Sequence, residues 1–296
     1  MSRLGVIVLL LFCSDAALPA GPGASGTNIS DYLAAAPAKQ FYLPDGLTEI
    51  SGVAVATNDS VYAHDDNYAI IYEVALSTGK ILRAFALGDP TVKADFEDIA
   101  VRGQLVYLLT GDGRIFEAPV GENRKRVHYN MYDTGIGEHC ETEGLVNGPE
   151  DGEFLILCKK MREAELKDRL VIYSWNLRSR APVATPWLNV SLDGLMPKLD
   201  QANFHPSAFA SRRDRGTLII VSSKGHSAIE IDAKGHLVDR SKLDKTRHPQ
   251  PEGITVMPDG RLVVSDEGAR VAEDRPLFSD EGTHGHGMIS VYAVPH

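Results

Sequence analysis

A short sequence pattern that recurs five times along the chain constrains the fold more than any other feature. The copies share a polar residue followed by small and β-branched residues, and they occupy residues 50–55, 96–101, 142–147, 206–211 and 251–256. Their aligned polar residues are Ser51, Glu97, Glu143, Ser207 and Glu252, at spacings of 46, 46, 64 and 45 residues. A repeat of this length indicates an array of similar units that bury their apolar surface against one another.

Each copy is followed by further runs of β-forming residues, separated by turn signals such as Gly111-Asp112-Gly113 and Pro258-Asp259-Gly260. Four strands in about 45 residues are typical of a β-propeller blade. The last copy shows three strands, and we expect residues 40–43 to supply its fourth and close the ring. The sequence therefore predicts an all-β, five-bladed β-propeller with four-stranded blades. Six blades are the alternative, if the long interval hides a degenerate blade.

The N-terminal residues predict export. One positive charge at Arg3, an apolar run over residues 4–13 and small residues after it are typical of a secretory signal peptide at residues 1–20. The apolar run is too short to span a bilayer, so we expect no transmembrane span in the mature chain. Residues 21–38 are rich in Ala, Gly, Pro and Ser and are interpreted as a linker. Residues 39–296 then form a single propeller domain in the periplasm or cell envelope, with secretion or a lipoprotein anchored through Cys13 as alternatives.

The net charge limits which partners the protein can bind, and the cysteine content indicates a possible disulfide. The net charge is −10 and no long Lys/Arg run exists, which argues against nucleic-acid binding and favours a soluble, monomeric protein. Cys140 and Cys158 lie on two successive strand-like runs. If these strands form a hairpin in an oxidising compartment, the two residues are within reach of a disulfide. Two buried free thiols are the alternative.

Polar residues gather where a propeller has its central channel. The innermost strands line that channel, and residues two apart on a strand point the same way. Stepping back two residues from the aligned position gives an outer layer of Glu49, Asp95, Glu141, His205 and Gln250. Several carboxylates around one axis repel one another unless a cation neutralises them, and hard oxygen ligands favour Ca²⁺, or less readily Mg²⁺. We therefore expect Glu97, Glu143 and Glu252 to bind a metal, with Glu49, Asp95 and Glu141 as a second acidic layer. A wet polar lining without a ligand is the alternative.

Charged residues also end the second strand of each blade. They are Asp65-Asp66, Asp112, Lys159-Lys160, Lys224 and Asp266-Glu267. We expect them near the opposite end of the channel from the starts of the inner strands. Lys159, Lys160 and Lys224 could hold an anion such as phosphate there, or could simply be solvated turn residues. Residues 280–286 contain two histidines and nearby acids, and they suggest either a weak metal cluster or a flexible loop.

Several of these segments resemble the SdiA-regulated (YjiK/CarP-like) family of exported bacterial β-propeller proteins. The similarity runs from about Leu47 to Val294 and rests on LTEISGVAV, DFEDIAV, TEGLV, HPSAFA followed by LIIVSS, and QPEGITVMPDGRLVVSDE. The resemblance implies a propeller that faces the periplasm or exterior, a link to calcium and, for some members, a phytase-like phosphohydrolase role. The chain departs from the family's Glu-Gly pattern at Asp98 and at Ser207-Ala208.

Three functions follow as hypotheses. The first is an exported propeller that binds Ca²⁺ in an acidic channel and acts in calcium-linked envelope physiology. The second is a Ca²⁺-dependent, phytase-like phosphoesterase acting on a phosphorylated small molecule, and the third is a platform for protein interactions. The Gly-x-Ser-x-Gly and His-Glu-x-x-His motifs are absent, which argues against a serine hydrolase and a zinc protease and leaves enzymatic activity open.

Overall fold

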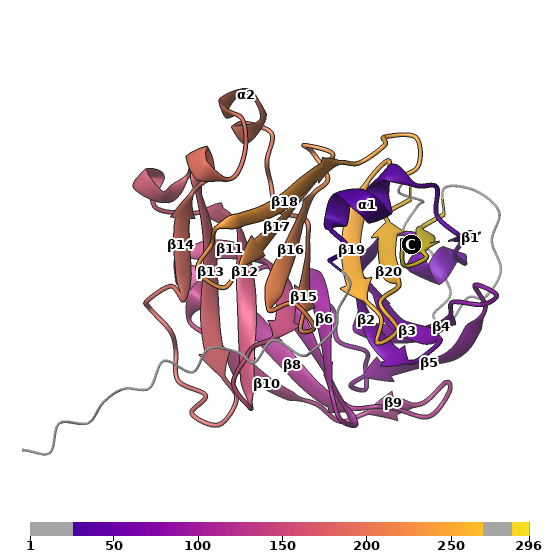
Figure 1. The fold of residues 1–296 in the computed structure, drawn as a ribbon. Helices are drawn as coiled ribbons and strands as arrows, with labels where there is room; N and C mark the ends of the chain where they lie inside the picture. The colour runs from indigo at the N-terminus through magenta and orange to yellow at the C-terminus, as the bar shows by residue number, and fades with distance from the viewer. Residues whose placement is uncertain (1–25, 269–285, 296) are drawn as a thin grey trace, which may run out of the picture.

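Five antiparallel sheets are arranged around a central axis in the computed structural model, which describes residues 26–268 and 286–295 (Figure 1). The predicted signal peptide and all of the 280–286 segment except His286 lie outside the described residues. The inner strands of the blades are β2 (Ile50–Thr57), β6 (Phe96–Arg102), β11 (Cys140–Asn147), β15 (Ala208–Arg212) and β19 (Pro251–Val256). The second strands are β3 (Ser60–Asp65), β7 (Leu105–Thr110), β12 (Glu153–Met161), β16 (Thr217–Ser222) and β20 (Leu262–Asp266).

The outer half of each blade follows the same order. The third strands are β4 (Ile70–Ala75), β8 (Arg114–Pro119), β13 (Arg169–Asn176), β17 (Ser227–Asp232) and β21 (Met288–Tyr292). The outermost strands are β5 (Ile81–Leu87), β10 (Asn130–Asp133), β14 (Leu188–Ser191), β18 (Leu237–Lys242) and β1 (Lys39–Tyr42). A two-stranded parallel contact adds β9 (Arg126–Val127) to the outside of β5. The predicted five-bladed, four-stranded propeller is therefore confirmed, and the six-bladed alternative is wrong.

The N-terminal strand closes the ring. Strand β1 pairs antiparallel with β21 in the last blade, with Phe41 opposite Ile289. The first and last parts of the propeller thus share one sheet, as the sequence predicted from residues 40–43. This closure leaves the last blade with a complete set of four strands.

The hydrophobic core is divided among the five interfaces between neighbouring blades. Alternate residues of a strand point to opposite faces of its sheet, and each face packs on a different neighbour. On β2, for example, Val53 packs with Val263 of the last blade, whereas Ala54 packs with Ile99 of the second blade. Because both faces are buried, the strands consist of nearly continuous apolar runs rather than alternating ones. The inner strands contact one another in a closed ring, which leaves a channel between them.

The structure corrects the interpretation of residues 21–38 as a linker for the part that it describes, which begins at residue 26. Helix α1 (Ile29–Ala34) packs against β17 and β18 of the fourth blade. Its residues Ile29, Tyr32 and Leu33 are buried there. These apolar residues are spaced as one face of a helix, and Asp31 accepts a hydrogen bond from the backbone N–H of Asn28 at 2.7 Å to start it. The sequence interpretation missed this short amphipathic helix because small residues surround its three apolar positions.

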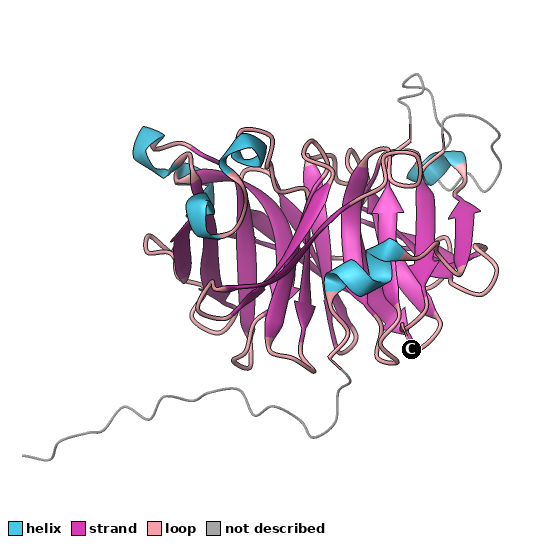
Figure 2. Cartoon of the chain, turned by 45° about the horizontal axis from the view of Figure 1, so that its top comes forward, coloured by secondary structure: helices cyan, strands magenta, loops and turns pink. Residues whose placement is uncertain are grey.

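The long third interval contains no additional blade. It holds 3₁₀ turns at Ala164–Leu166 and Leu192–Gly194 and the short helix α2 (Lys198–Gln201), which lie at one edge of the ring (Figure 2). Two further 3₁₀ turns lie at Asp45–Leu47 and Ile136–Glu138. Within the described part of the chain, no helix has the length and apolar character needed to cross a membrane.

Candidate functional site

A β-bulge interrupts the inner strand of four blades at the aligned polar position. The antiparallel register skips one residue in each of these strands, namely Ser51, Glu97, Glu143 and Glu252. A bulge leaves the extra residue unpaired and changes the direction of its side chain. Since each inner strand is also the edge strand of its sheet, we infer that the bulges turn these side chains toward the channel. Simple alternation, on which the sequence prediction relied, is not the reason for their position.

Close packing behind the bulge explains the glycine that follows it. A Cβ atom on Gly144 would lie 2.4 Å from the Cβ atom of Phe209 on the next blade, which no side chain tolerates. The second blade has Asp98 at this position instead. Its carboxylate accepts backbone hydrogen bonds from Leu145 at 2.7 Å and from Ile99 at 2.8 Å. Asp98 therefore ties β6 to β11 as a structural residue, and this departure from the Glu-Gly pattern does not remove a channel group.

The fourth blade contributes no carboxylate because its aligned residue is Ser207. The hydroxyl of Ser207 donates to the backbone oxygen of Pro251 at 2.7 Å and accepts from the backbone N–H of Ser223 at 2.9 Å. These bonds connect the start of β15 to Pro251 at the start of β19 and to Ser223 just after β16. Ser207 is buried and has a structural role.

One lysine lies among the three bulged glutamates. Lys159 Nζ is 3.0 Å from Glu143 Oε1, and the charges of Glu97 and Glu252 also act on it. Burial works against the charge of Lys159, but Glu143 and Glu97 outweigh burial and raise its pKa. From the sequence, Lys159 was either an anion-binding group or a solvated turn residue. The structure instead makes it the counter-ion of the glutamates, because β12 brings it beside the bulge.

Burial raises the pKa of all three glutamates above the ordinary value of 4.5. For Glu252 burial outweighs the opposing charge of Lys159, Glu267 adds to the rise, and the pKa reaches about 8. Burial and the neighbouring charge of Glu143 raise the pKa of Glu97. Three such groups around one lysine either retain protons near neutral pH or attract a further cation.

Antiparallel pairing places the end of each second strand beside the start of its inner strand. Ile50 is opposite Asp65, and Glu141 is opposite Lys160. The expectation that the two sets lie at opposite ends of the channel is therefore wrong, since neighbouring antiparallel strands run in opposite directions. Both sets share one end of the channel, which we call the rim.

Three carboxylates form a cluster on the acidic side of the rim. One ligand oxygen from each of Glu49, Asp65 and Asp66 lies within 4.8 Å of the other two, and we call this group the acidic cluster. The Asn67 side chain donates to Glu49 Oε2 at 2.8 Å and also to Asp66, while its backbone N–H donates to Asp65 Oδ1 at 3.1 Å. The backbone oxygen of Asp66 accepts from Phe96 N at 2.7 Å, which holds the cluster between the first and second blades.

Negative charge dominates the surroundings of Asp66. Burial, followed by the charges of Asp65 and Glu49 and then of Glu267 and Asp95, raises its pKa from 3.8 to about 8. All four charges that shift this pKa are carboxylates. The acidic cluster thus differs from the bulged glutamates, for which the positive charge of Lys159 opposes the rise in pKa.

The predicted second acidic layer is only partly brought together. Glu49 belongs to the acidic cluster, but its partners are Asp65 and Asp66. Asp95 is exposed at the rim, where its charge acts on Asp66. Glu141 is opposite Lys160 on the next strand. Glu49, Asp95 and Glu141 lie at the starts of the inner strands of three different blades. Equal positions in the repeat therefore do not bring their side chains to one point.

The other side of the rim is basic. His205 Nε2 and Lys224 Nζ are 3.3 Å apart, and burial followed by the charges of Lys224, Lys159 and Lys160 lowers the pKa of His205. Lys160 and Lys224 are exposed. The acidic cluster and Asp95 therefore lie on the first and second blades of the rim, whereas the exposed lysines lie on the third and fourth, with Glu141 opposite Lys160.

A disulfide joins Cys140 and Cys158 across β11 and β12. Their Cα atoms are 5.8 Å apart, within the reach expected from the sequence. The bond connects the start of the inner strand to the strand that carries Lys159.

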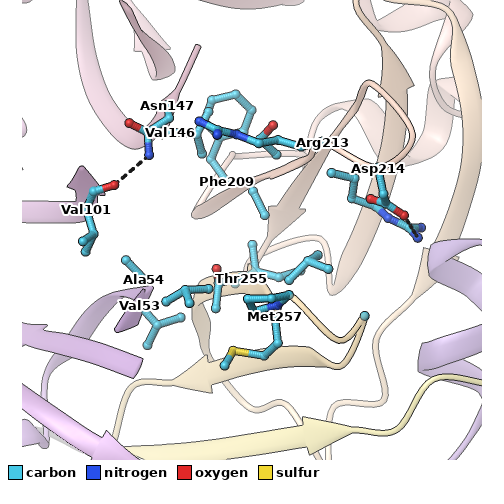
Figure 3. Close-up of a pocket in the computed structure, with 18 of the residues that line it drawn as sticks. Val53, Ala54, Val101, Val146, Asn147, Phe209, Arg213, Asp214, Thr255 and Met257 are labelled. Atoms are coloured by element: carbon cyan, nitrogen blue, oxygen red, sulfur yellow. Dashed lines mark hydrogen bonds and ion pairs between the residues drawn. The ribbon is translucent and has the colours of Figure 1, made fainter. Parts of the chain in front are cut away.

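The opposite end of the channel contains a cavity of about 680 Å³ that the sequence did not predict. All five inner strands line it (Figure 3). The third residue after the aligned polar position is small in every blade, and these residues are Ala54, Ala100, Val146, Ala210 and Thr255. This recurrence is the signal in the sequence that could have indicated an open channel.

Comparisons with known proteins agree with this architecture. A glutaminyl cyclase of Myxococcus xanthus has a TM-score of 0.54 at 14% identity, with 86% of this chain and 94% of that chain covered. The PQQ-bound aldose sugar dehydrogenase of Streptomyces coelicolor has a TM-score of 0.50 at 13% identity, with 87% and 99% covered. At such low identity these structures show a shared propeller fold and nothing about the site.

A comparison with curated protein sequences finds no significant match. The model of one protein family does match, over residues 190–273, which hold the QPEGITVMPDGRLVVSDE segment and the fourth blade. Over these residues the chain matches the SdiA-regulated family, and the resemblance predicted from its motifs is confirmed.

Proposed function

We propose that the protein binds a calcium ion at the acidic cluster on the rim of its channel. The observation that carries this proposal is the convergence of Glu49, Asp65 and Asp66 within 4.8 Å, where the turn before β2 meets the end of β3 in the first blade. Burial and then the charges of Asp65 and Glu49 raise the pKa of Asp66, and a divalent cation would relieve the repulsion among the three carboxylates.

The donor set fits calcium better than transition metals. Carboxylate oxygens are hard ligands, and neither cysteine nor histidine belongs to the cluster. Ca²⁺ takes about six to eight oxygen ligands in flexible geometry, whereas Mg²⁺ demands near-ideal octahedral geometry. The negative charges of Glu267 and Asp95 also act on Asp66, and these two carboxylates would add to the negative potential that attracts the ion.

The bulged glutamates are a weaker location for the ion. Glu97, Glu143 and Glu252 were expected as the ligands from sequence, but Lys159 already lies among them. A positive charge 3.0 Å from Glu143 repels a second cation. We therefore place the ion at the acidic cluster.

The predicted export of the chain suggests where the proposed calcium site acts. The signal-like residues 1–20 favour a position in the periplasm or cell envelope. In such a compartment a calcium-responsive propeller fits a role in calcium-linked envelope physiology.

Calcium titration of chelator-treated protein by calorimetry tests the proposal. We expect one ion per chain and a rise in melting temperature, since a ligand at 100 times its Kd adds about 2.7 kcal/mol to stability. Asp66→Asn should weaken binding at least tenfold. Asp112→Asn is the matched control, because Asp112 lies at the same rim but pairs with Arg114.

Two results contradict the proposal. One is the absence of binding heat and of a melting shift at millimolar calcium. The other is an unchanged Kd in Asp66→Asn together with a weakened Kd in Glu143→Gln, which would place the ion at the bulged glutamates.

A phosphoesterase activity is the second candidate. The observation that favours it is the shared rim, which carries Lys160, Lys224 and His205 as well as the acidic cluster. A bound metal and these groups would together hold a phosphoryl group. Calcium-dependent release of phosphate from a phosphorylated substrate, lost in Lys224→Gln, is the expected result, and absence of release at saturating calcium rejects it.

A further inference from the structure

The cavity at the end of the channel opposite the rim is a second candidate site, independent of the acidic cluster. Its volume of about 680 Å³ is within the range of small-molecule pockets. The edges of the inner strands that face it pair with no other strand of the described chain. Side chains already use some of the backbone groups on these edges, since the N–H of Leu145 donates to Asp98 at 2.7 Å and the oxygen of Val101 accepts from Asn147 Nδ2 at 2.9 Å.

The lining divides into an apolar side and a polar side. The fourth residue after the aligned position is valine in three blades, at Val55, Val101 and Val256. In the third and fourth blades it is Asn147 and Ser211. A ligand that fills the cavity therefore needs an apolar body and a polar end directed at the third and fourth blades.

Arg213 supplies the charge on the polar side. It follows β15, it is exposed, and it makes no ion pair with any residue that the structure describes. In Figure 3 its side chain extends toward Asn147, whereas Asp214 lies apart from it. A second cavity of about 400 Å³ is also lined by Asn147, Ser211 and Arg213, so the guanidinium adjoins both spaces.

The other charges at the mouth already have partners. Asp214 lies 3.5 Å from Arg212 Nη2, and Asp259 lies 2.7 Å from Arg261 Nε. Arg212 also donates to the backbone oxygen of Thr27 at 2.7 Å. The charge left for a ligand is therefore positive.

We propose that this cavity binds a small molecule with an apolar body and one anionic head group, and that Arg213 holds the head group. The apolar body lies against the valine side and Phe209. A guanidinium binds carboxylate, sulfonate or phosphate through charge-assisted hydrogen bonds.

Two fluorescent probes with nearly the same apolar body test this. Anilinonaphthalene sulfonate carries an anionic group, and phenylnaphthylamine lacks it. Both are titrated into the full-length mature protein with chelator present, so the outcome does not depend on calcium. We expect one sulfonate probe per chain, bound about tenfold more tightly than the uncharged probe, a difference of about 1.4 kcal/mol.

Variants then locate the site. Arg213→Gln should abolish the tenfold preference and leave the uncharged probe unchanged, whereas Arg240→Gln, an exposed arginine on the outermost strand of the same blade, should change neither. Thr255→Phe should weaken both probes at least tenfold by filling the cavity, with Val256→Phe as the substitute if the first variant does not fold. Circular dichroism confirms the native fold of each variant. Unchanged binding in the filled variants, or a preference that survives in Arg213→Gln, overturns the proposal.

Discussion

Replacing Glu252 by glutamine should change how stability depends on pH. The folded protein holds a proton on Glu252 up to about pH 8, whereas the unfolded chain releases it near 4.5. A pKa raised on folding contributes stability that is complete below the unfolded value and is lost as pH rises through the folded value. Wild-type protein should therefore lose stability between about pH 5 and pH 8, and the variant should lose less.

The size of the effect follows from the rise in pKa. From 4.5 to about 8, at about 1.36 kcal/mol per pH unit, the upper limit is about 5 kcal/mol. Water in the channel screens this partly buried carboxyl, so we expect about 2 to 3 kcal/mol. Glu252 also interacts with Ser223 and Lys159, and glutamine retains only the hydrogen-bonding capacity.

Urea unfolding from pH 5 to pH 8.5, with chelator present, measures this difference. The free energy of unfolding of Glu252→Gln minus that of wild type should rise by about 2 to 3 kcal/mol across the range. Glu165→Gln, which removes an exposed carboxylate in the 3₁₀ turn Ala164–Leu166, is the control and should follow wild type. Parallel curves for wild type and Glu252→Gln would refute the assignment of a buried, protonated carboxyl at this position.

Two further predictions concern the same end of the channel. Lys159→Met should destabilise the protein by about 2 to 3 kcal/mol at pH 8 and by less at pH 5. The reason is that the lysine neutralises Glu143 only when that carboxyl is ionised. Equal losses of unfolding free energy at the two pH values, measured by urea unfolding, would contradict this prediction. Replacing Cys140 and Cys158 by alanine should cost about 3 kcal/mol, since the bond closes a loop with a sequence separation of 18 residues. The double variant should therefore unfold at a lower urea concentration than wild type, and reductant should not change its unfolding. If the double variant and unreduced wild type unfold at the same urea concentration, the disulfide has no stabilising role.

The repeat was sufficient to predict much of the propeller. Five copies of one pattern determine the number of inner strands, and their spacing leaves room for four strands per blade. The closing strand was also predictable, because the last copy lacked one strand and an unassigned β-type run remained near the N-terminus. Helix α1 was missed, since its single turn of apolar residues is short beside the small residues around it.

The chemistry of the channel depends on contacts that no repeat position encodes. The sequence alone identified Glu97, Glu143 and Glu252 as channel residues, because a shared motif places them at equal points of successive blades. Only the tertiary structure decided that Lys159 neutralises them and that Glu49 joins Asp65 and Asp66. The reason is physical: a repeat determines where a residue lies along its own strand, whereas bulges, strand direction and neighbouring blades determine which side chains meet across the channel.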